Sequence, residues 1–415
     1  MNPSSHKKIR EWEELCRKYP DVSPFVLLKL SMVWHGAVLT DRALTRLQED
    51  DYRFGTAEPF GISFAGREKK RVMPGPILLR DASFVYINYG EDYADPYTAD
   101  FDPETGLFLL YEGDALIDCI DFVPRPAFFG KYTSSGRLMD TIADVRAQKL
   151  ILTAYQRCLF WKGGDQCHYC AFFTGGNSDP ELSPEDAYET VREALKEPGR
   201  FSEVYLSGGS DYTGEPAFSN EIDRYIRVLR AIGRCFNGRF PSQLMAPAYR
   251  KEDVRRIYDS TGITSYCPNI EIMDRDLFRK LCPGKEKWVG YDEWVRRTLD
   301  AVEVFGRGNV YTQVVAGAEL ARPCGFSSID EAVRSNLEGC EFYAKHGVIC
   351  LSTIWRPHRA ARLGLQPMPP LEYFVRIAQG FHDIRKACGL VSFDDDYKRC
   401  GNHPDSDLER SDRLW

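Results

Sequence analysis

The chain has 415 residues, which is long enough for one large domain with a smaller appendage. Its formal net charge is −7, so no overall basic charge favours nucleic acid or an anionic membrane as a partner. The first residues lack the apolar segment of a secretory signal, and no apolar run approaches membrane-spanning length. We therefore expect a cytoplasmic protein whose 13 cysteines are thiols, metal ligands or core residues.

Residues 1–145 predict an α+β extension. Apolar spacing indicates helices at 8–19 and 24–33, and strand-like runs follow at 84–88, 107–111 and 116–120. The Gly- and Asp-rich turns between these runs favour a small antiparallel sheet. We expect this sheet to pack on the rest of the protein, either as a lid or substrate platform or as plain structural cover.

Strand-like and helix-like segments alternate from about residue 146 to residue 390. Each expected strand is followed by a segment with helical spacing, and the first of these helices opens on Ser183 and Pro184, which are typical start residues. Six such units with right-handed crossovers predict an α/β fold, a partial (β/α)6 TIM-like barrel. The strands are expected at 150–154, 203–207, 243–246, 264–272, 310–316 and 348–354.

Three cysteines, Cys158, Cys167 and Cys170, lie on the loop after the first of these strands. Three thiolates on one loop can bind three irons of a cubane cluster and leave the fourth iron open to a ligand. Two other interpretations stay open: a closed Cys₃His zinc site that includes His168, or cysteines without a ligand. Because His168 directly follows Cys167, the pair is awkward for a single tetrahedral ion.

Other polar or glycine-rich segments fall at the ends of the later strands. The loops at the carboxyl ends of parallel strands meet over one mouth of a barrel, where the chemistry of such folds takes place. Asn269 and Glu271 are two apart and are expected on one face of the fourth strand. The second strand leads into Gly208, Gly209 and Ser210, the fifth into Glu319, and the sixth into Arg356.

The segment 355–359 places two arginines, Arg356 and Arg359, at the end of the last strand. A guanidinium fork there suits a carboxylate or phosphate on a substrate. The alternatives are a solvated basic loop, or an arginine that serves the cofactor.

The partial barrel, the cysteine loop after its first strand and the Gly-Gly turn after its second resemble the radical S-adenosylmethionine (SAM) enzymes. The segments 269–271 and 282–285, Asn-Ile-Glu and Cys-Pro-Gly-Lys, resemble the biotin-synthase-related branch in particular. The usual spacing of that family is Cys-x3-Cys-x2-Cys, whereas this chain has Cys-x8-Cys-x2-Cys. We expect the added residues at 161–164 to form an extra turn beside the cysteines.

The resemblance implies that Cys158, Cys167 and Cys170 bind a 4Fe-4S cluster whose open iron holds SAM. It implies a radical SAM enzyme that cleaves SAM to a 5′-deoxyadenosyl radical, which abstracts hydrogen from a small molecule in cofactor or specialised metabolism. An electron donor of the flavodoxin or ferredoxin type is the expected partner. The implied cofactor-binding residues are Tyr169, Gly208, Gly209, Ser210, Asn269, Glu271, Glu319 and Arg356.

A second class of function stays open, that of a zinc- or cluster-stabilised barrel which acts as a binding or scaffold protein without SAM chemistry.

The last segment, residues 391–415, is highly charged. We expect it to be a solvated tail over the barrel mouth.

Overall fold

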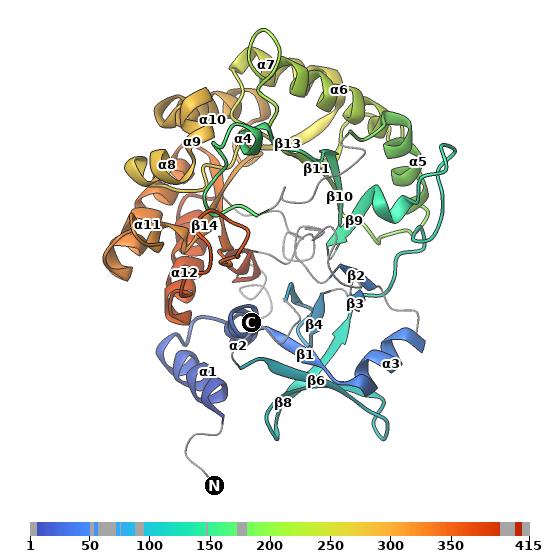
Figure 1. The fold of residues 1–415 in the computed structure, drawn as a ribbon, viewed down its shortest axis with the longest axis vertical. Helices are drawn as coiled ribbons and strands as arrows, with labels where there is room; N and C mark the ends of the chain where they lie inside the picture. The colour runs from blue at the N-terminus through green and yellow to red at the C-terminus, as the bar shows by residue number, and fades with distance from the viewer. Residues whose placement is uncertain are drawn as a thin grey trace.

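The fold combines an open, curved parallel sheet with a smaller mixed sheet (Figure 1). Figure 1 shows helices around the outer side of the curved sheet and the N-terminal elements beside its open side. The structure is a computed structural model, and it describes residues 6–49, 54–56, 72–74, 76–87, 95–146, 148–171, 181–390 and 403–408.

The curved sheet has seven strands in the order β15-β14-β13-β12-β11-β10-β9. Strands β10 to β15 are parallel, which confirms the six predicted βα units, and β9 adds an unpredicted antiparallel edge. Their bounds are Ala143–Arg146 (β9), Lys149–Tyr155 (β10), Glu203–Gly208 (β11), Phe240–Met245 (β12), Ile263–Cys267 (β13), Val310–Ala316 (β14) and Val348–Ile354 (β15).

One long helix follows each parallel strand, and the starts of these helices obey local rules. Ser183 caps α5 by accepting a hydrogen bond from the Asp186 amide, and Ser328 forms a capping box with Glu331 on α11. Two short helices that were not predicted, α8 (Arg275–Leu281) and α9 (Pro283–Trp288), precede α10. The long helices are α5 (Pro184–Ala194), α6 (Ser219–Gly233), α7 (Lys251–Thr261), α10 (Tyr291–Phe305), α11 (Ile329–Lys345) and α12 (Leu371–Ala387).

The fourth strand of the barrel ends earlier than predicted. Strand β13 stops at Cys267, because Pro268 has no N–H with which to continue the ladder. Glu271 then returns to the sheet with a left-handed backbone, φ 68°, and exchanges hydrogen bonds with β14. The prediction that Asn269 and Glu271 share one face of a strand over 264–272 is therefore wrong.

The two faces of the curved sheet differ in character. Alternate residues such as Leu150, Leu152 and Ala154 are fully buried against the surrounding helices. The opposite face, which lines the inside of the barrel, is polar near its base. There the ammonium of Lys149 lies 3.0 Å from the Glu203 carboxylate and 4.5 Å from the centre of the Tyr205 ring.

The smaller sheet has six strands in the order β1-β6-β7-β8-β4-β5. All its neighbours are antiparallel except β1 and β6, so the expected antiparallel sheet is largely confirmed. Residue 88 of the predicted strand 84–88 lies outside the described residues. The strands are Ala37–Leu39 (β1), Ile77–Leu79 (β4), Phe84–Val85 (β5), Tyr97–Asp102 (β6), Leu107–Glu112 (β7) and Ala115–Phe122 (β8), and Phe54–Thr56 (β2) pairs separately with Val72–Pro74 (β3).

Helix α2 (Pro24–His35) joins the two sheets, and it follows α1 (Lys7–Lys18) and precedes α3 (Asp41–Glu49). Its residues Leu27 and Leu30 pack in the barrel's core, whereas Leu28 and Met32 pack in the core of the smaller sheet. A helix that is apolar on all sides must be covered on all sides. The N-terminal extension therefore packs on the barrel through α2, as expected.

Part of the C-terminal segment is buried, which corrects the expectation of a solvated tail. Residues 403–408 lie within the protein, where Asp405 accepts hydrogen bonds from Ser352 of β15 and from Arg385 of α12. Asp407 forms a buried ion pair with Lys29 of α2. These pairings neutralise the charges whose exposure the sequence had suggested.

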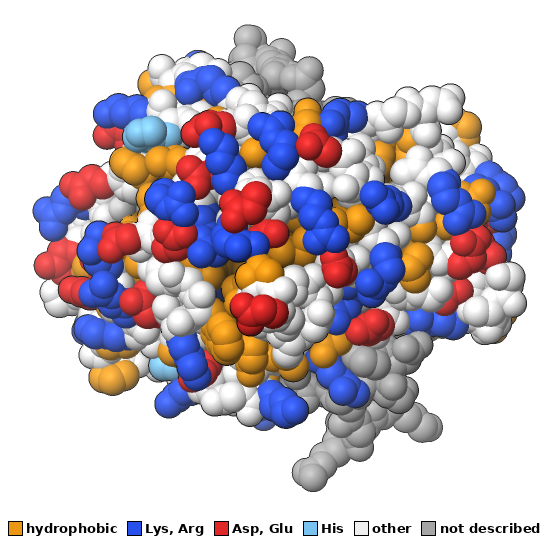
Figure 2. Space-filling view, turned by 90° about the horizontal axis from the view of Figure 1, so that it is seen from above, with side chains coloured by type: hydrophobic (Ala, Val, Ile, Leu, Met, Phe, Trp, Pro, Cys, Tyr) orange, Lys and Arg blue, Asp and Glu red, His pale blue; other side chains and the backbone are white. Residues whose placement is uncertain are grey.

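No helix among the residues that the structure describes is both long and apolar enough to cross a bilayer. On the face drawn in Figure 2, lysines and arginines are interspersed with aspartates and glutamates. Neither sign of charge dominates that face.

Candidate active site

The cysteine loop begins where β10 ends. Cys158 occupies the N-cap position of α4 (Leu159–Lys162), a single helical turn that closes at Gly163. Gly164 follows with a φ of 75°, a conformation that glycine adopts without strain. The residues added to the family spacing thus form a turn beside the cysteines, as predicted.

None of the three cysteines forms a disulfide, and each is partly exposed. The Cys170 amide donates to the Cys167 carbonyl at 3.0 Å, so the second and third cysteines share a tight turn. Burial raises the pKa of Cys158 to about 11, and the neighbouring charge of Cys167 is the next cause. The charge of the second cysteine therefore affects the ionisation of the first.

Backbone hydrogen bonds join this loop to the segments that follow three other strands. After β11, the Ser210 carbonyl accepts from the Leu159 amide at 2.8 Å. After β13, the Leu281 carbonyl accepts from the His168 amide at 2.8 Å, and after β15 the Leu363 amide donates to the His168 carbonyl at 2.9 Å. The strand ends converge on the cysteine loop, as expected of a barrel mouth.

The Gly208-Gly209 turn packs directly against the cysteine loop. The Gly209 amide donates to the Tyr155 carbonyl at 2.9 Å. A β-carbon on Gly209 would lie 2.8 Å from the α-carbon of Cys158, and one on Gly208 would lie 3.0 Å from the Tyr225 hydroxyl. The turn therefore needs glycine so that the two loops can approach each other.

A buried carboxyl group on α6 supports this turn. Glu221 accepts hydrogen bonds from the Asp211 amide, just after Ser210, and from the Tyr249 hydroxyl. Burial raises the pKa of Glu221 to about 8. At neutral pH the Glu221 carboxyl group is therefore largely protonated. It holds the Gly208-Gly209 turn in place without a full negative charge beside the turn.

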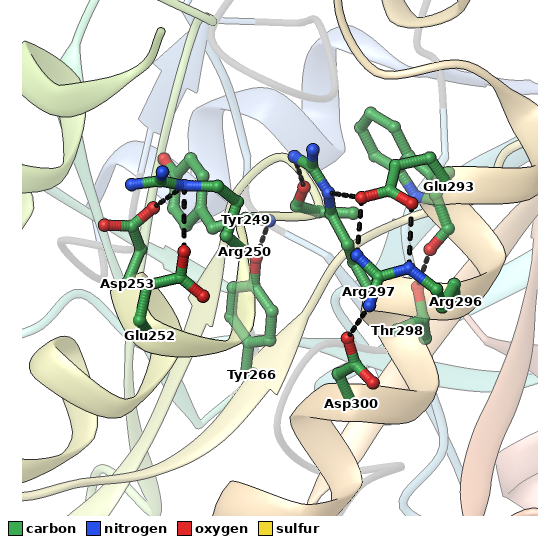
Figure 3. A network of polar contacts seen from close by, with 12 residues as sticks. Tyr249, Arg250, Glu252, Asp253, Tyr266, Glu293, Arg296, Arg297, Thr298 and Asp300 are labelled. Atoms are coloured by element: carbon green, nitrogen blue, oxygen red, sulfur yellow. Dashed lines mark hydrogen bonds and ion pairs between the residues drawn. The ribbon is translucent and has the colours of Figure 1, made fainter. Parts of the chain in front are cut away.

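Tyr249 is itself held by the network drawn in Figure 3. Its amide donates to the Tyr266 hydroxyl at 3.1 Å. Arg297 of α10 reaches the Ala248 carbonyl at 3.1 Å and the Glu293 carboxylate at 2.7 Å. The loop after β12 is thereby tied to α10, which keeps Tyr249 in place beside Glu221.

Asn269 and Glu271 make contacts that the sequence did not predict. The Lys285 ammonium, which is buried, donates to the Asn269 carbonyl at 2.7 Å and to the Glu271 carboxylate at 2.8 Å. The Asn269 amide group lies 3.1 Å from the Met245 sulfur and accepts from the Cys267 thiol at 2.9 Å. The left-handed backbone at Glu271 is held by its hydrogen bonds with β14, and strained residues of this kind concentrate at functional sites.

A fourth cysteine, Cys282, lies beside the loop. Its sulfur is 3.7 Å from the Tyr169 hydroxyl, and its thiol forms a hydrogen bond with Cys167 that lowers the pKa of Cys167. Burial raises the pKa of Cys282 well above its ordinary value. The segment 282–285 carries part of the family resemblance, but the sequence did not predict a site role for Cys282 or Lys285.

Glu319 and Arg356 are bonded to other parts of the protein. The Glu319 carboxylate accepts from the Gly317 amide at 2.9 Å and from Asn336 at 2.8 Å, and burial raises its pKa. Arg356 donates to the Tyr86 carbonyl of the N-terminal extension at 2.5 Å. Each therefore has a structural contact in addition to any role in the site.

The donor set suits an iron–sulfur cluster. Three partly exposed thiols, none of them in a disulfide, lie on one loop at the mouth of the barrel. In the described part of the chain, no three His, Cys, Asp or Glu side chains gather closely enough to hold a single metal ion. A cubane cluster does not need its ligands around one ion, because the three thiolates would each bind a different iron and leave the fourth iron open. The three cysteines fit that pattern.

No protein-family model matches the sequence. The chain is similar to bacteriochlorophyllide c C-7(1)-hydroxylase from Chlorobaculum limnaeum, with 22% identity over 270 residues. The match covers 60% of this chain and 63% of that protein, so the chain spans less than two thirds of the length of this curated relative.

Solved structures give weaker likenesses. The FeFe-hydrogenase maturase HydG from Carboxydothermus hydrogenoformans is 14% identical, with a TM-score of 0.44 over 60% of this chain and 54% of that one. A radical SAM methyltransferase from Sphaerobacter thermophilus is 16% identical, with a TM-score of 0.40 over 74% of this chain and 81% of that one.

The cysteine loop stands at the mouth of an open (β/α)6 barrel, and a glycine turn packs against it. These features agree with the resemblance to the radical SAM enzymes that the motifs carry.

Proposed function

We propose that this protein uses SAM and a 4Fe-4S cluster to abstract hydrogen from a small molecule. One observation carries the proposal: Cys158, Cys167 and Cys170, none of them in a disulfide, lie on one loop at the carboxyl edge of a parallel barrel. When bound, the cluster would supply the electron that cleaves SAM into methionine and a 5′-deoxyadenosyl radical.

In this proposal the three cysteines are the protein's iron ligands. Because burial raises the pKa of Cys158 to about 11, its thiol holds a proton at neutral pH that iron binding must displace. The short turn between Cys167 and Cys170 presents two sulfurs together, while α4 sets the distance to the first. The hydrogen bonds from the segments after β11, β13 and β15 hold the loop in place for assembly.

We assign SAM to the same mouth. Gly208, Gly209 and Ser210 border the cysteine loop, and backbone without side chains lets a ligand approach closely. Lys285 keeps the Glu271 carboxylate in one orientation, which suits it to accept hydrogen bonds from a ribose or an ammonium group. The other assigned contacts are Tyr169, Asn269, Glu319 and Arg356.

The substrate is proposed to be a small molecule that enters the barrel from this mouth. The inner face of the barrel is polar at its base, the end away from the mouth. Lys149, Glu203 and Tyr205 supply hydrogen-bonding groups at that base. The curated relative is a hydroxylase by name, and oxidation at carbon is one outcome of hydrogen abstraction. An external reductant of the flavodoxin or ferredoxin type is the proposed electron source.

The test is anaerobic reconstitution with iron and sulfide, followed by turnover with SAM and a strong reductant. We expect 5′-deoxyadenosine by mass spectrometry from the parent protein and none from Cys170→Ala. A colourless protein that holds one tightly bound zinc and yields no 5′-deoxyadenosine would instead support the scaffold function. A reconstituted cluster that leaves SAM intact would overturn the proposed reaction.

A further inference from the structure

Backbone hydrogen bonds on both sides of Cys282 hold this fourth cysteine against the middle of the cysteine loop. The carbonyl of the residue before it accepts from the His168 amide at 2.8 Å. Two residues after it, the Gly284 amide donates to the Asp165 carbonyl at 2.9 Å. Cys282 therefore lies opposite the part of the loop that contains Cys167.

The position of Cys282 is fixed by the two helices that meet at it. The residue ends α8 and begins α9, and its amide donates to the Phe278 carbonyl at 2.8 Å. A β-carbon on Gly284 would lie 2.6 Å from a carbon of the Phe160 ring, so α9 packs closely on the turn of the cysteine loop. Because Cys282 is fully buried, its thiol faces the protein rather than solvent.

Two hydrogen-bond donors meet the sulfur of Cys167. One is the Cys282 thiol, and the other is the Tyr169 hydroxyl. The Tyr169 oxygen lies 3.7 Å from the Cys282 sulfur, so the three groups are mutual neighbours. Thiols and phenols that are withdrawn from water keep their protons at neutral pH. Both groups can therefore donate to a Cys167 thiolate.

A hydrogen bond to a cluster ligand affects how easily the cluster is reduced. Reduction adds one negative charge to the cluster and its thiolate sulfurs. A donor at one of these sulfurs stabilises the reduced form more than the oxidised form, so it raises the reduction potential. Such donors also keep the ligand in one orientation.

We propose that Cys282 is a positioning residue for the cluster: its thiol, together with the Tyr169 hydroxyl, donates to the Cys167 sulfur and raises the cluster's reduction potential. This inference rests on the proposed function. Cys282 is not assigned as an iron ligand, because the three thiolates of the loop leave the fourth iron open to SAM. The external reductant can then reduce the cluster at a less negative potential.

A potentiometric titration of the reconstituted full chain without SAM, followed by EPR of the reduced cluster, tests the proposal. Cys282→Ala removes the donor and should make the midpoint potential more negative, with unchanged iron and sulfide content. One hydrogen bond to a charged group predicts a roughly tenfold change in the reduction equilibrium, which is about 59 mV for one electron. Cys282→Ser keeps a donor and should shift the potential less. Tyr169→Phe should shift it in the same direction as Cys282→Ala.

Cys340→Ala is the matched control, because Cys340 is also a fully buried thiol beside another cysteine, Cys350, but lies on α11. Its potential should equal that of the parent. An unchanged potential in Cys282→Ala, or an equal shift in Cys340→Ala, would overturn the inference and leave the proposed function intact. Loss of iron from Cys282→Ala would also overturn it, because iron can bind without this donor. A parent protein that assembles no cluster would overturn the proposed function itself, and the inference with it.

Discussion

Replacement of Gly209 by alanine is expected to displace the first cysteine of the loop. The added β-carbon would lie 2.0 Å from the Arg157 carbonyl oxygen, 2.4 Å from its carbonyl carbon and 2.8 Å from the Cys158 α-carbon. These separations are far below ordinary contact distances, so the backbone at 157–158 or the turn itself must move.

The loss of stability depends on which atoms the added β-carbon would meet. Overpacking a core costs about 1–3 kcal/mol when side chains can shift. The β-carbon added at position 209 would meet backbone atoms, which move less readily than side chains. We therefore expect the free energy of unfolding to fall by about 3 kcal/mol. Because Cys158 must shift relative to Cys167 and Cys170, the variant should also lose most of its bound iron.

Two measurements check this prediction: iron per chain after anaerobic reconstitution, and urea denaturation. Gly163→Ala is the matched control on the same loop, since its β-carbon would be 3.5 Å from the nearest atom, an Asp165 carboxylate oxygen. That variant should keep its iron and its stability. If Gly209→Ala bound as much iron as the parent, the packing argument for this turn would be refuted.

Two buried carboxyl groups give further predictions. The folded-state pKa of Glu221 is raised from 4.5 to about 8, so the folded protein holds a proton that the unfolded chain releases above pH 4.5. Its contribution to stability therefore falls between these pH values, by up to about 1.4 kcal/mol per pH unit. Glu221→Gln should flatten this slope in urea titrations, and an unchanged slope would refute the assignment. Asp405→Ala leaves the fully buried Arg385 without its carboxylate and should cost roughly 3–5 kcal/mol by urea denaturation, whereas Glu303→Ala at an exposed pair should cost less than about 1 kcal/mol. Equal losses would contradict the account of the C-terminal segment.

The barrel was predictable because its signals are local. Apolar periodicity located the six parallel strands, and capping residues such as Ser183 located the start of a helix. The position of the cysteine loop followed from the rule that loops meet at the carboxyl ends of parallel strands. These features depend on neighbours within a few residues, which a sequence displays directly.

The details of the site were harder to predict from the sequence, because they depend on contacts between distant segments. The left-handed backbone of Glu271 is imposed by β14, and its partner Lys285 comes from a helix that was not predicted. The proximity of Cys282 to Cys167 likewise arises only when α8 and α9 fold over the loop. The glycine turn was expected to admit a ligand, and the structure adds its close packing on Cys158.

The central claim is that Cys158, Cys167 and Cys170 hold a 4Fe-4S cluster, and counting iron and sulfide in the reconstituted protein tests it most directly. The account predicts about four irons and four sulfides per chain for the parent and for Cys16→Ala, whose cysteine lies on α1 away from the loop. Each of the three loop variants to alanine should lose most of both. A full complement of iron and sulfide in the Cys167→Ala protein would contradict the assignment of this loop as the cluster site.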